Sequence, residues 1–345
     1  MLASAEHRTG SEPLAETRRQ PKRRGSGRRG GQGLLLAALD LGTNNCRLLI
    51  ATPERDGNLR IVDSFSRIVR LGEGTSRTGA LSEAAMERTV AALKVCAERL
   101  DKHRVRHVCA IATEACRRAS NAQVLIDRVA KETGIRLSVV TAAEEARLAA
   151  VGCAPLIGAD YDGALAFDIG GGSTEAIWLR HGAGASSLRQ FASVPLGVMS
   201  LAEADGEGSF AAMRDAMLAR FGEVRREMDK SGVFDVARHH LLGTSGTVTT
   251  LAGVAMNLPR YVRALVDASW HDCTDILAVV NRLVALDRKD RAALGCVGEE
   301  RADLIVPGCA IYSAIQTVWP CVRLRVADRG LREGILRELM EEAER

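Results

Sequence analysis

The chain has 345 residues, of which 46% are apolar and 26% charged, so it can bury a sizeable core and fits two domains better than one. Its formal charge of +4 is concentrated at the start: residues 1–33 hold eight Lys and Arg against three Asp and Glu, which leaves 39 against 40 elsewhere. No stretch approaches the ~18 consecutive apolar residues of a membrane-spanning helix, so no membrane partner is expected.

Residues 1–33 are predicted to be a disordered basic tail, because their arginines lie among Gly, Ser and Pro with few apolar residues to offset ordering. Such a charge run can attract nucleic acid or another polyanion, but a solvated extension is more common, so we expect no specific nucleic-acid partner. The nine cysteines form no C-x-x-C pair, and several lie among apolar neighbours. They indicate reduced core thiols and a cytoplasmic protein, without disulfides or zinc.

The first half of the chain is predicted to alternate strands and helices. An apolar strand at 34–39 leads into the acidic turn Asp40-Leu41-Gly42-Thr43-Asn44-Asn45, and a second strand follows at 47–51. Further strands are predicted at 61–68, 105–112 and 137–140, with helices at 82–100, which Ser82 caps, and at 121–132. The alternation predicts a mixed α/β layer.

The second half repeats this design. An apolar run at 164–167 enters the turn Asp168-Ile169-Gly170-Gly171-Gly172-Ser173-Thr174-Glu175, and a strand follows at 176–179. The pentapeptides 38–42 and 166–170 match in pattern at an offset of 128, which indicates an ancient duplication. A third turn, Gly243-Thr244-Ser245-Gly246-Thr247, joins a strand to a helix, and the chain closes with a strand at 323–327 and an amphipathic helix at 331–342.

The three turns are predicted to bind phosphate groups. Each follows an apolar strand, and small residues let backbone N–H groups approach an anion closely. The candidate residues are Gly42, Thr43, Asn44, Gly170, Gly171, Gly172, Ser173, Thr174, Gly243, Ser245, Gly246 and Thr247. Asp40 and Asp168, at the ends of matching strands, are expected to face each other across a cleft and to hold Mg²⁺ through carboxylates and water.

A hydrolase also needs a base for the attacking water and cations for the phosphoryl charge. Glu144 and Glu145 begin a predicted helix, where acidic residues are also favourable without any catalytic role. Arg117 follows a strand, and its spacing alone does not distinguish it from a surface residue. Glu175 is more informative, because it ends the second Gly-rich turn.

Several motifs, in this order, resemble the exopolyphosphatase/guanosine pentaphosphate phosphohydrolase (Ppx/GppA) family of the acetate and sugar kinase, Hsp70 and actin superfamily. The resemblance extends over residues 36–338 or so. It rests on Leu39-Asp40-Leu41-Gly42-Thr43-Asn44, Arg70-Leu71-Gly72-Glu73-Gly74, Ala112-Thr113-Glu114-Ala115 with Arg117, Glu144-Glu145-Ala146-Arg147-Leu148, Asp168 to Glu175, Pro195-Leu196-Gly197, Gly243 to Thr247, Glu300-Arg301-Ala302-Asp303 and Gly330-Leu331-Arg332-Glu333-Gly334.

The resemblance implies an α/β fold of two ribonuclease H-like (actin-like ATPase) lobes, 34–145 and 146–345, with an interlobe cleft and with the last helix packed back on the first lobe. By similarity, Glu145 is the catalytic base and Arg117 binds the phosphate chain. Asp168 and Glu175 match acidic positions linked to Mg²⁺ and catalysis. Three features depart from the family pattern: Asn45-Cys46 in the first turn, Ser200 where many relatives have Arg, and an end at 345 without the HD-like domains of long relatives.

We therefore expect an exopolyphosphatase that releases terminal phosphate from inorganic polyphosphate with Mg²⁺. One alternative is a guanosine pentaphosphate phosphohydrolase, and another is a non-catalytic sensor of guanosine tetraphosphate or pentaphosphate. A superfamily kinase is disfavoured, because the 144–147 motif resembles that of the hydrolases. A homodimer is left open.

Overall fold

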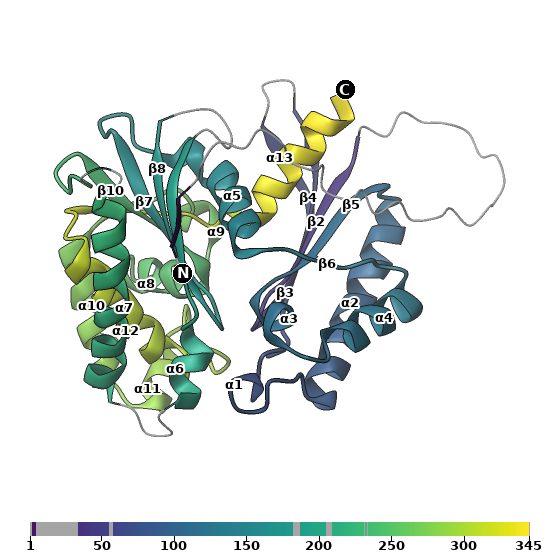
Figure 1. Ribbon diagram of the computed structural model, residues 1–345, viewed down its shortest axis with the longest axis horizontal. Coiled ribbons are helices and arrows are strands. Elements are labelled where there is room, and N and C mark those ends of the chain that lie inside the picture. The colour runs from purple at the N-terminus through teal and green to yellow at the C-terminus, as the bar shows by residue number, and fades with distance from the viewer. Residues whose placement is uncertain are drawn as a thin grey trace. The chain divides into compact units, whose positions relative to one another are not determined.

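The computed structural model describes residues 2–4, 34–54, 58–181, 187–204, 209–230, 232 and 234–344. They form two compact units (Figure 1). The N-terminal unit contains 34–145 and 331–344, and the C-terminal unit contains 146–330 with strand β1 (Leu2–Ser4). Apart from β1, the predicted disordered tail lies outside the described residues.

The N-terminal unit is built on a five-stranded sheet of order β4-β3-β2-β5-β6. Strands β2, β3 and β4 form an antiparallel meander, in which each strand is antiparallel to the next, and β5 and β6 run parallel to β2. Their bounds are Leu36–Leu41 (β2), Asn45–Pro53 (β3), Leu59–Ile68 (β4), His107–Ala112 (β5) and Ser138–Val139 (β6).

The C-terminal unit repeats this order within a seven-stranded sheet, β1-β9-β8-β7-β10-β12-β11. Here β7, β8 and β9 form the antiparallel meander, and β10 and β12 continue it in parallel on the other side of β7. The bounds are Gly163–Ile169 (β7), Thr174–Arg180 (β8), Leu188–Val194 (β9), His239–Thr244 (β10), Trp270–Asp272 (β11) and Arg323–Val326 (β12). Two α/β units with one strand order confirm the predicted fold class.

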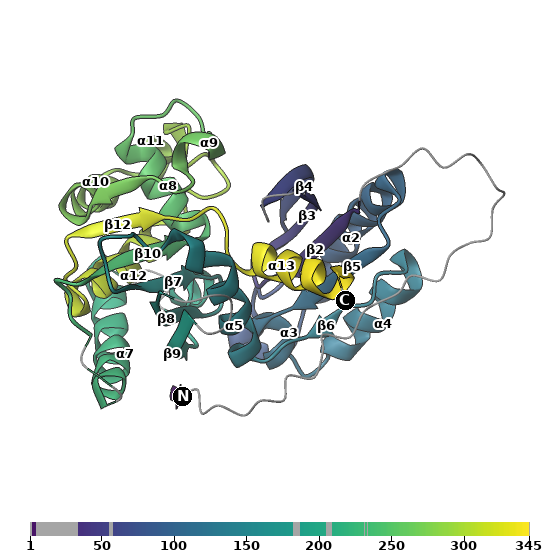
Figure 2. The same cartoon turned by 90° about the horizontal axis from the view of Figure 1, so that it is seen from above.

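Helices cover both sheets. The N-terminal unit contains α1 (Thr75–Thr78), α2 (Glu83–His103), α3 (Glu114–Arg118), α4 (Ala122–Thr133) and α13 (Leu331–Glu344). As predicted, the Ser82 hydroxyl caps α2 by accepting a hydrogen bond from the N–H of Ala85. Helix α13 returns from the far end of the chain to pack against β2, β3 and β5 (Figure 2).

The helices of the C-terminal unit are α6 (Val198–Ala204), α7 (Phe210–Lys230), α8 (Ser245–Ala255), α9 (Arg263–Val266), α10 (Cys273–Ala285), α11 (Arg288–Ala293) and α12 (Ile305–Val318). Helix α5 (Ala142–Cys153) crosses the boundary between the units, which falls after Glu145. The short 3-10 helix η1 (Ala154–Leu156) follows it.

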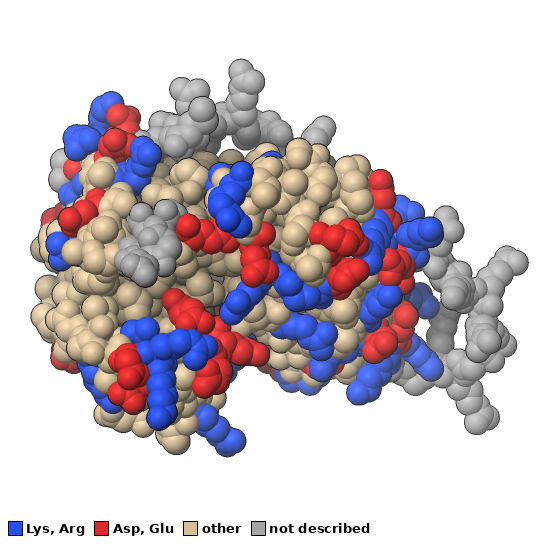
Figure 3. Space-filling model, turned by 90° about the horizontal axis from the view of Figure 1, so that it is seen from below, with Lys and Arg blue, Asp and Glu red and all other residues tan. Residues whose placement is uncertain are grey.

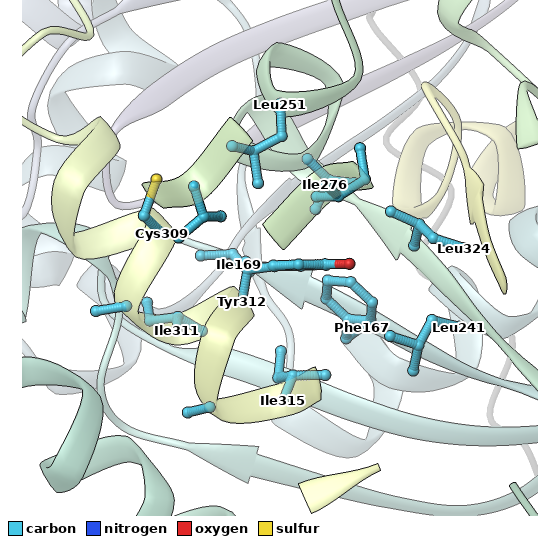
Figure 4. Close-up of a cluster of buried hydrophobic side chains, with 14 of the residues drawn as sticks. Phe167, Ile169, Leu241, Leu251, Ile276, Cys309, Ile311, Tyr312, Ile315 and Leu324 are labelled. Carbon is cyan, nitrogen blue, oxygen red and sulfur yellow. The ribbon is translucent and has the colours of Figure 1, made fainter. Parts of the chain in front are cut away.

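The alternation of side chains along β7 separates two cores. Its odd-numbered residues, such as Phe167, face a large cluster that α7, α8, α10 and α12 complete. Figure 4 shows the buried Tyr312 ring in this cluster beside Phe167, whose ring centre lies 6.2 Å away. The even-numbered residues Ala164 and Ala166 face a second cluster, to which α5 contributes Ala146, Ala149, Ala150 and Cys153. Asp168 continues this second face.

The charged side chains and the cysteines are distributed as in an ordinary globular protein. Lys and Arg side chains are interspersed with Asp and Glu on the face drawn in Figure 3. All nine cysteines are free and buried, and burial raises the pKa of Cys309 to about 12. Among the described helices, none has both the length and the apolar character needed to cross a membrane.

Candidate active site

A row of four polar side chains crosses the C-terminal sheet where the strands end. The pairing register places Asp168 opposite Glu175 of β8, and Glu175 opposite Ser193 of β9. On the other side, Asp168 is paired with Thr244, the last residue of β10. Because directly paired residues project from the same face of a sheet, all four lie on the face that α5 covers. The row therefore places two carboxylates side by side between two hydroxyls.

Glu175 is buried, with 4% of its surface exposed, and its orientation is fixed by two hydroxyl groups. Its Oε1 accepts hydrogen bonds from Ser173 Oγ at 2.7 Å and from Ser193 Oγ at 2.9 Å. A buried carboxylate is costly unless its oxygens are hydrogen-bonded, so these hydroxyls stabilise it in this position. Ser193 was not identified from the sequence, because its role depends on the register of β9.

The second Gly-rich turn is held by α6 through its carbonyl groups. The N–H of Val198 donates to Gly170 O at 3.0 Å, and that of Met199 donates to Gly171 O at 2.8 Å. The hydroxyl of Ser200 donates to Gly172 O at 3.2 Å. Ser200 therefore braces the turn.

These contacts determine where the N–H groups of the turn point. In a planar trans peptide, the C=O of one residue and the N–H of the next point in opposite directions. Since three consecutive carbonyls face α6, the N–H groups of Gly171, Gly172 and Ser173 point away from it. Successive N–H groups of this kind form an anion-binding concavity.

Two side chains of this turn are engaged within the protein. The Thr174 hydroxyl donates to Leu196 O at 2.8 Å, and Thr174 is fully buried. The Ser173 hydroxyl donates to Glu175, as described above. Phosphate contacts from this part of the turn would therefore come from backbone N–H groups.

The first turn, in the N-terminal unit, is oriented in a similar way. Asn44 O accepts from the N–H groups of Val69 at 2.8 Å and Arg70 at 3.0 Å, and Thr43 O accepts from Gly72 N–H at 2.9 Å. The motif at 70–74 thus braces this turn from outside. The buried Oδ1 of Asn44 has no hydrogen-bond partner among the described residues.

The third turn is the junction of β10 and α8. Ser245 adopts a φ of 92°, which is uncommon for a non-glycine residue and is found at functional sites. Gly243 allows close packing, because a Cβ there would lie 2.6 Å from Val248 and 2.8 Å from Phe167. The N–H groups of Gly246 and Thr247 are at the start of the helix, where backbone donors have no helical partner and the helix dipole favours anions.

Arg117 and Glu145, 28 residues apart in sequence, form an ion pair within the N-terminal unit. Arg117 Nη1 donates to Glu145 Oε2 at 2.7 Å and to Val140 O at 3.0 Å. Its Nε and Nη2 donate to Glu114 Oε2 at 3.1 and 2.9 Å. Burial by itself lowers the pKa of Arg117, but the two carboxylates outweigh it and raise this pKa. Glu114 was not selected from the sequence, although its i, i+3 spacing from Arg117 on α3 could have indicated it.

The arrangement fits a divalent cation that is shared with a ligand. Among the described residues, no three His, Cys, Asp or Glu side chains come together as a metal cage. Mg²⁺ is typically held by one or two carboxylates, with water and substrate phosphates completing its shell. Asp168 and Glu175 provide two such carboxylates in register. Asp40 belongs to the other unit, so its predicted position opposite Asp168 stays a prediction.

Two ribonuclease H-like units with Gly-rich turns at their strand ends and paired carboxylates define the actin-like class of phosphate-handling proteins. Within that class, the model of the Ppx/GppA phosphatase family matches residues 50–343, so the chain belongs to this family.

Similar proteins agree with this assignment. Exopolyphosphatase 2 of Mycobacterium tuberculosis is 34% identical over 291 residues, which cover 81% of this chain and 89% of that protein. Exopolyphosphatase 1 of the same organism is 29% identical over 90% of this chain and 89% of its own length. Among solved structures, an exopolyphosphatase from Cytophaga hutchinsonii matches with a TM-score of 0.78 and 28% identity, covering 89% of this chain and 98% of that one. The Aquifex aeolicus Ppx/GppA family member matches with a TM-score of 0.74 and 28% identity, covering 90% and 99%.

Proposed function

We propose that the protein is an exopolyphosphatase, which releases terminal phosphate from inorganic polyphosphate by attack of water. The observation that carries this proposal is the 2.7 Å contact between Arg117 and Glu145. It joins the two positions that family similarity assigns to phosphate binding and to the base. The names of the similar proteins support polyphosphate as the substrate, and the free, buried cysteines support a cytoplasmic location.

Arg117 links substrate binding to the base. Its Nη1 donates to Glu145 Oε2, and a carboxylate is the form of this side chain that accepts a proton from water. A phosphoryl oxygen that approaches the guanidinium competes with Glu145 for Nη1. Binding of the chain end therefore turns Glu145 toward the attacking water, while Glu114 retains Arg117 through its other nitrogens.

The Gly-rich turns hold the phosphate chain through backbone N–H groups, and Asp168 and Glu175 are the residues that would hold Mg²⁺, with Asp40 as a further candidate. When bound, the cation neutralises phosphoryl charge. The hydroxyls of Ser173 and Ser193 keep the Glu175 carboxylate in a fixed position for this role.

Phosphate release from short polyphosphate, long polyphosphate, guanosine pentaphosphate and ATP tests the proposal. We expect polyphosphate to be the preferred substrate, and Glu145→Gln to reduce its turnover by roughly 10²–10⁴-fold. Glu144→Gln is the matched control at the adjacent helix position and should retain activity. Full turnover by Glu145→Gln would refute the assignment of the base. Preference for guanosine pentaphosphate would favour a guanosine pentaphosphate phosphohydrolase. Nucleotide binding without any release of phosphate would favour a non-catalytic sensor.

A further inference from the structure

We propose that Thr244 binds substrate directly, its hydroxyl donating a hydrogen bond to a phosphoryl oxygen seated at the start of α8. This inference rests on the proposed function, because it takes polyphosphate as the ligand. It adds a side-chain donor to a turn from which the sequence suggested the neighbouring residues only.

The first observation is a buried hydroxyl group with no partner. Thr244 is 6% exposed, and its Oγ1 has no hydrogen-bond partner within the part of the chain that the structure describes. Buried polar atoms are nearly always hydrogen-bonded, and each exception calls for an explanation. A ligand that completes the hydrogen bond is one such explanation.

The second observation is that Thr244 occupies the N-cap position of α8 without capping the helix. A threonine at this position commonly accepts a hydrogen bond from the second or third N–H of the helix. Here the backbone is extended, with φ −107° and ψ −179°, and the side chain makes no capping bond. The 11-residue helix α8 therefore presents its first N–H groups together with an unused hydroxyl. Both are donors that favour an anion.

The third observation is the place of Thr244 in the polar row. Ser193, at one end, donates its hydroxyl to Glu175. Thr244, at the other end, is paired with Asp168, and its Cγ2 lies 4.0 Å from the point where a Cβ on Gly330 would be. A hydroxyl donor beside a carboxylate that would hold the cation can bind an oxygen of the phosphate that the same cation contacts.

Thr244→Val tests the inference, because valine keeps the shape and the methyl group and removes only the hydroxyl. The parent protein for this test is the Glu145→Gln variant, and the ligand is inorganic tripolyphosphate. Its dissociation constant is measured by calorimetry, once with Mg²⁺ and once with EDTA. We expect Thr244→Val to weaken binding about tenfold in both conditions, as for loss of one hydrogen bond to a charged group. Thr244→Ser should bind as the parent does.

Thr89→Val is the matched control. Thr89 is a fully buried threonine of α2, and its hydroxyl already donates to Ala85 O at 2.8 Å. This variant should bind tripolyphosphate normally but melt at a lower temperature. Thr244→Val, in contrast, should melt at the same or a higher temperature than the parent without ligand, because it removes a hydroxyl for which the described residues provide no partner.

Three results would overturn the inference while leaving the proposed function intact. They are parental affinity in Thr244→Val, a lower melting temperature without ligand, and a binding defect confined to Mg²⁺, which would assign the hydroxyl to the cation site. If the parent neither binds tripolyphosphate nor, with Glu145 restored, hydrolyses polyphosphate, it is the proposed function that fails.

Discussion

Gly197→Ala should damage catalysis by displacing the second Gly-rich turn, although residue 197 has no predicted contact with phosphate. A Cβ at Gly197 would lie 2.5 Å from both Gly170 O and Gly171 C, and 2.6 Å from Gly171 O. These are backbone atoms, which cannot rotate away. Ordinary van der Waals contact begins at 3.4 Å, so the turn must move by about 0.9 Å.

A displacement of this size moves the N–H groups that are proposed to hold the phosphate chain. Misplacement by about 1 Å can cost roughly 10²-fold in rate, so we expect kcat/KM for polyphosphate to fall about 100-fold. Overpacking should also lower the free energy of unfolding by about 1–3 kcal/mol. Phosphate release at varied substrate concentration and urea unfolding measure the two effects.

Gly222→Ala provides the control. Gly222 lies within α7, and the nearest atom to an added Cβ is Arg226 Nη1 at 3.8 Å, the mobile end of a side chain. This variant should keep full activity. Its free energy of unfolding should rise by up to about 1 kcal/mol, because alanine has a higher helix propensity than glycine. If Gly197→Ala is folded and its kcat/KM stays within threefold of wild type, the proposed role of the turn geometry is wrong.

Arg117→Lys should lower kcat/KM about 100-fold, because an ammonium group cannot reproduce the forked contacts of a guanidinium, whereas Arg118→Lys, at a more exposed position, should retain activity. Ser193→Ala should weaken Mg²⁺ binding about tenfold, as measured by calorimetry, and Ser193→Thr should restore it in part. His240 Nε2 accepts from Gly158 N–H at 3.0 Å, and burial lowers the pKa of His240 from 6.5 to about 4. The unfolded chain therefore binds more protons between these values, and the free energy of unfolding should fall by about 3 kcal/mol from pH 6.5 to pH 4. In urea titrations at several pH values, His240→Asn should reduce this dependence of the unfolding free energy on pH. If the dependence is unchanged in the variant, His240 is not its source.

Local patterns predicted the mixed α/β layer and the three turns, and the family resemblance supplied the two ribonuclease H-like lobes. Apolar runs that end in Asp-x-Gly mark strand ends, and the offset of 128 between Asp40 and Asp168 indicated a duplication, with which the shared strand order of the two sheets agrees. The division after Glu145 and the packing of α13 arise from contacts between distant segments. Periodicity within a segment does not report such contacts.

The sequence could not supply the partners of the site residues, for the same reason. Ser193 meets Glu175 only through the register of β8 and β9, and an alternating strand pattern leaves that register open. The pairing of Arg117 with Glu145 spans 28 residues, and it was family similarity rather than spacing that selected these two. The Thr244 hydroxyl lacks a hydrogen-bond partner among the described residues, and this depends on the three-dimensional positions of its neighbours, which no local pattern encodes.

The two duplicated turns are oriented by the same physical means. In each, a later segment of the same unit binds the carbonyl groups of the turn: residues 69–72 do so for the first turn, and α6 does so for the second. Because each peptide is planar, fixing the carbonyls also fixes the N–H groups on the opposite side. Phosphate affinity should therefore depend on residues that never touch phosphate. Gly72 is the counterpart of Gly197 in this respect, since a Cβ there would lie 2.3 Å from Thr43 Cγ2. A threonine methyl group can yield where a backbone carbonyl cannot, so Gly72→Ala should impair catalysis less than Gly197→Ala.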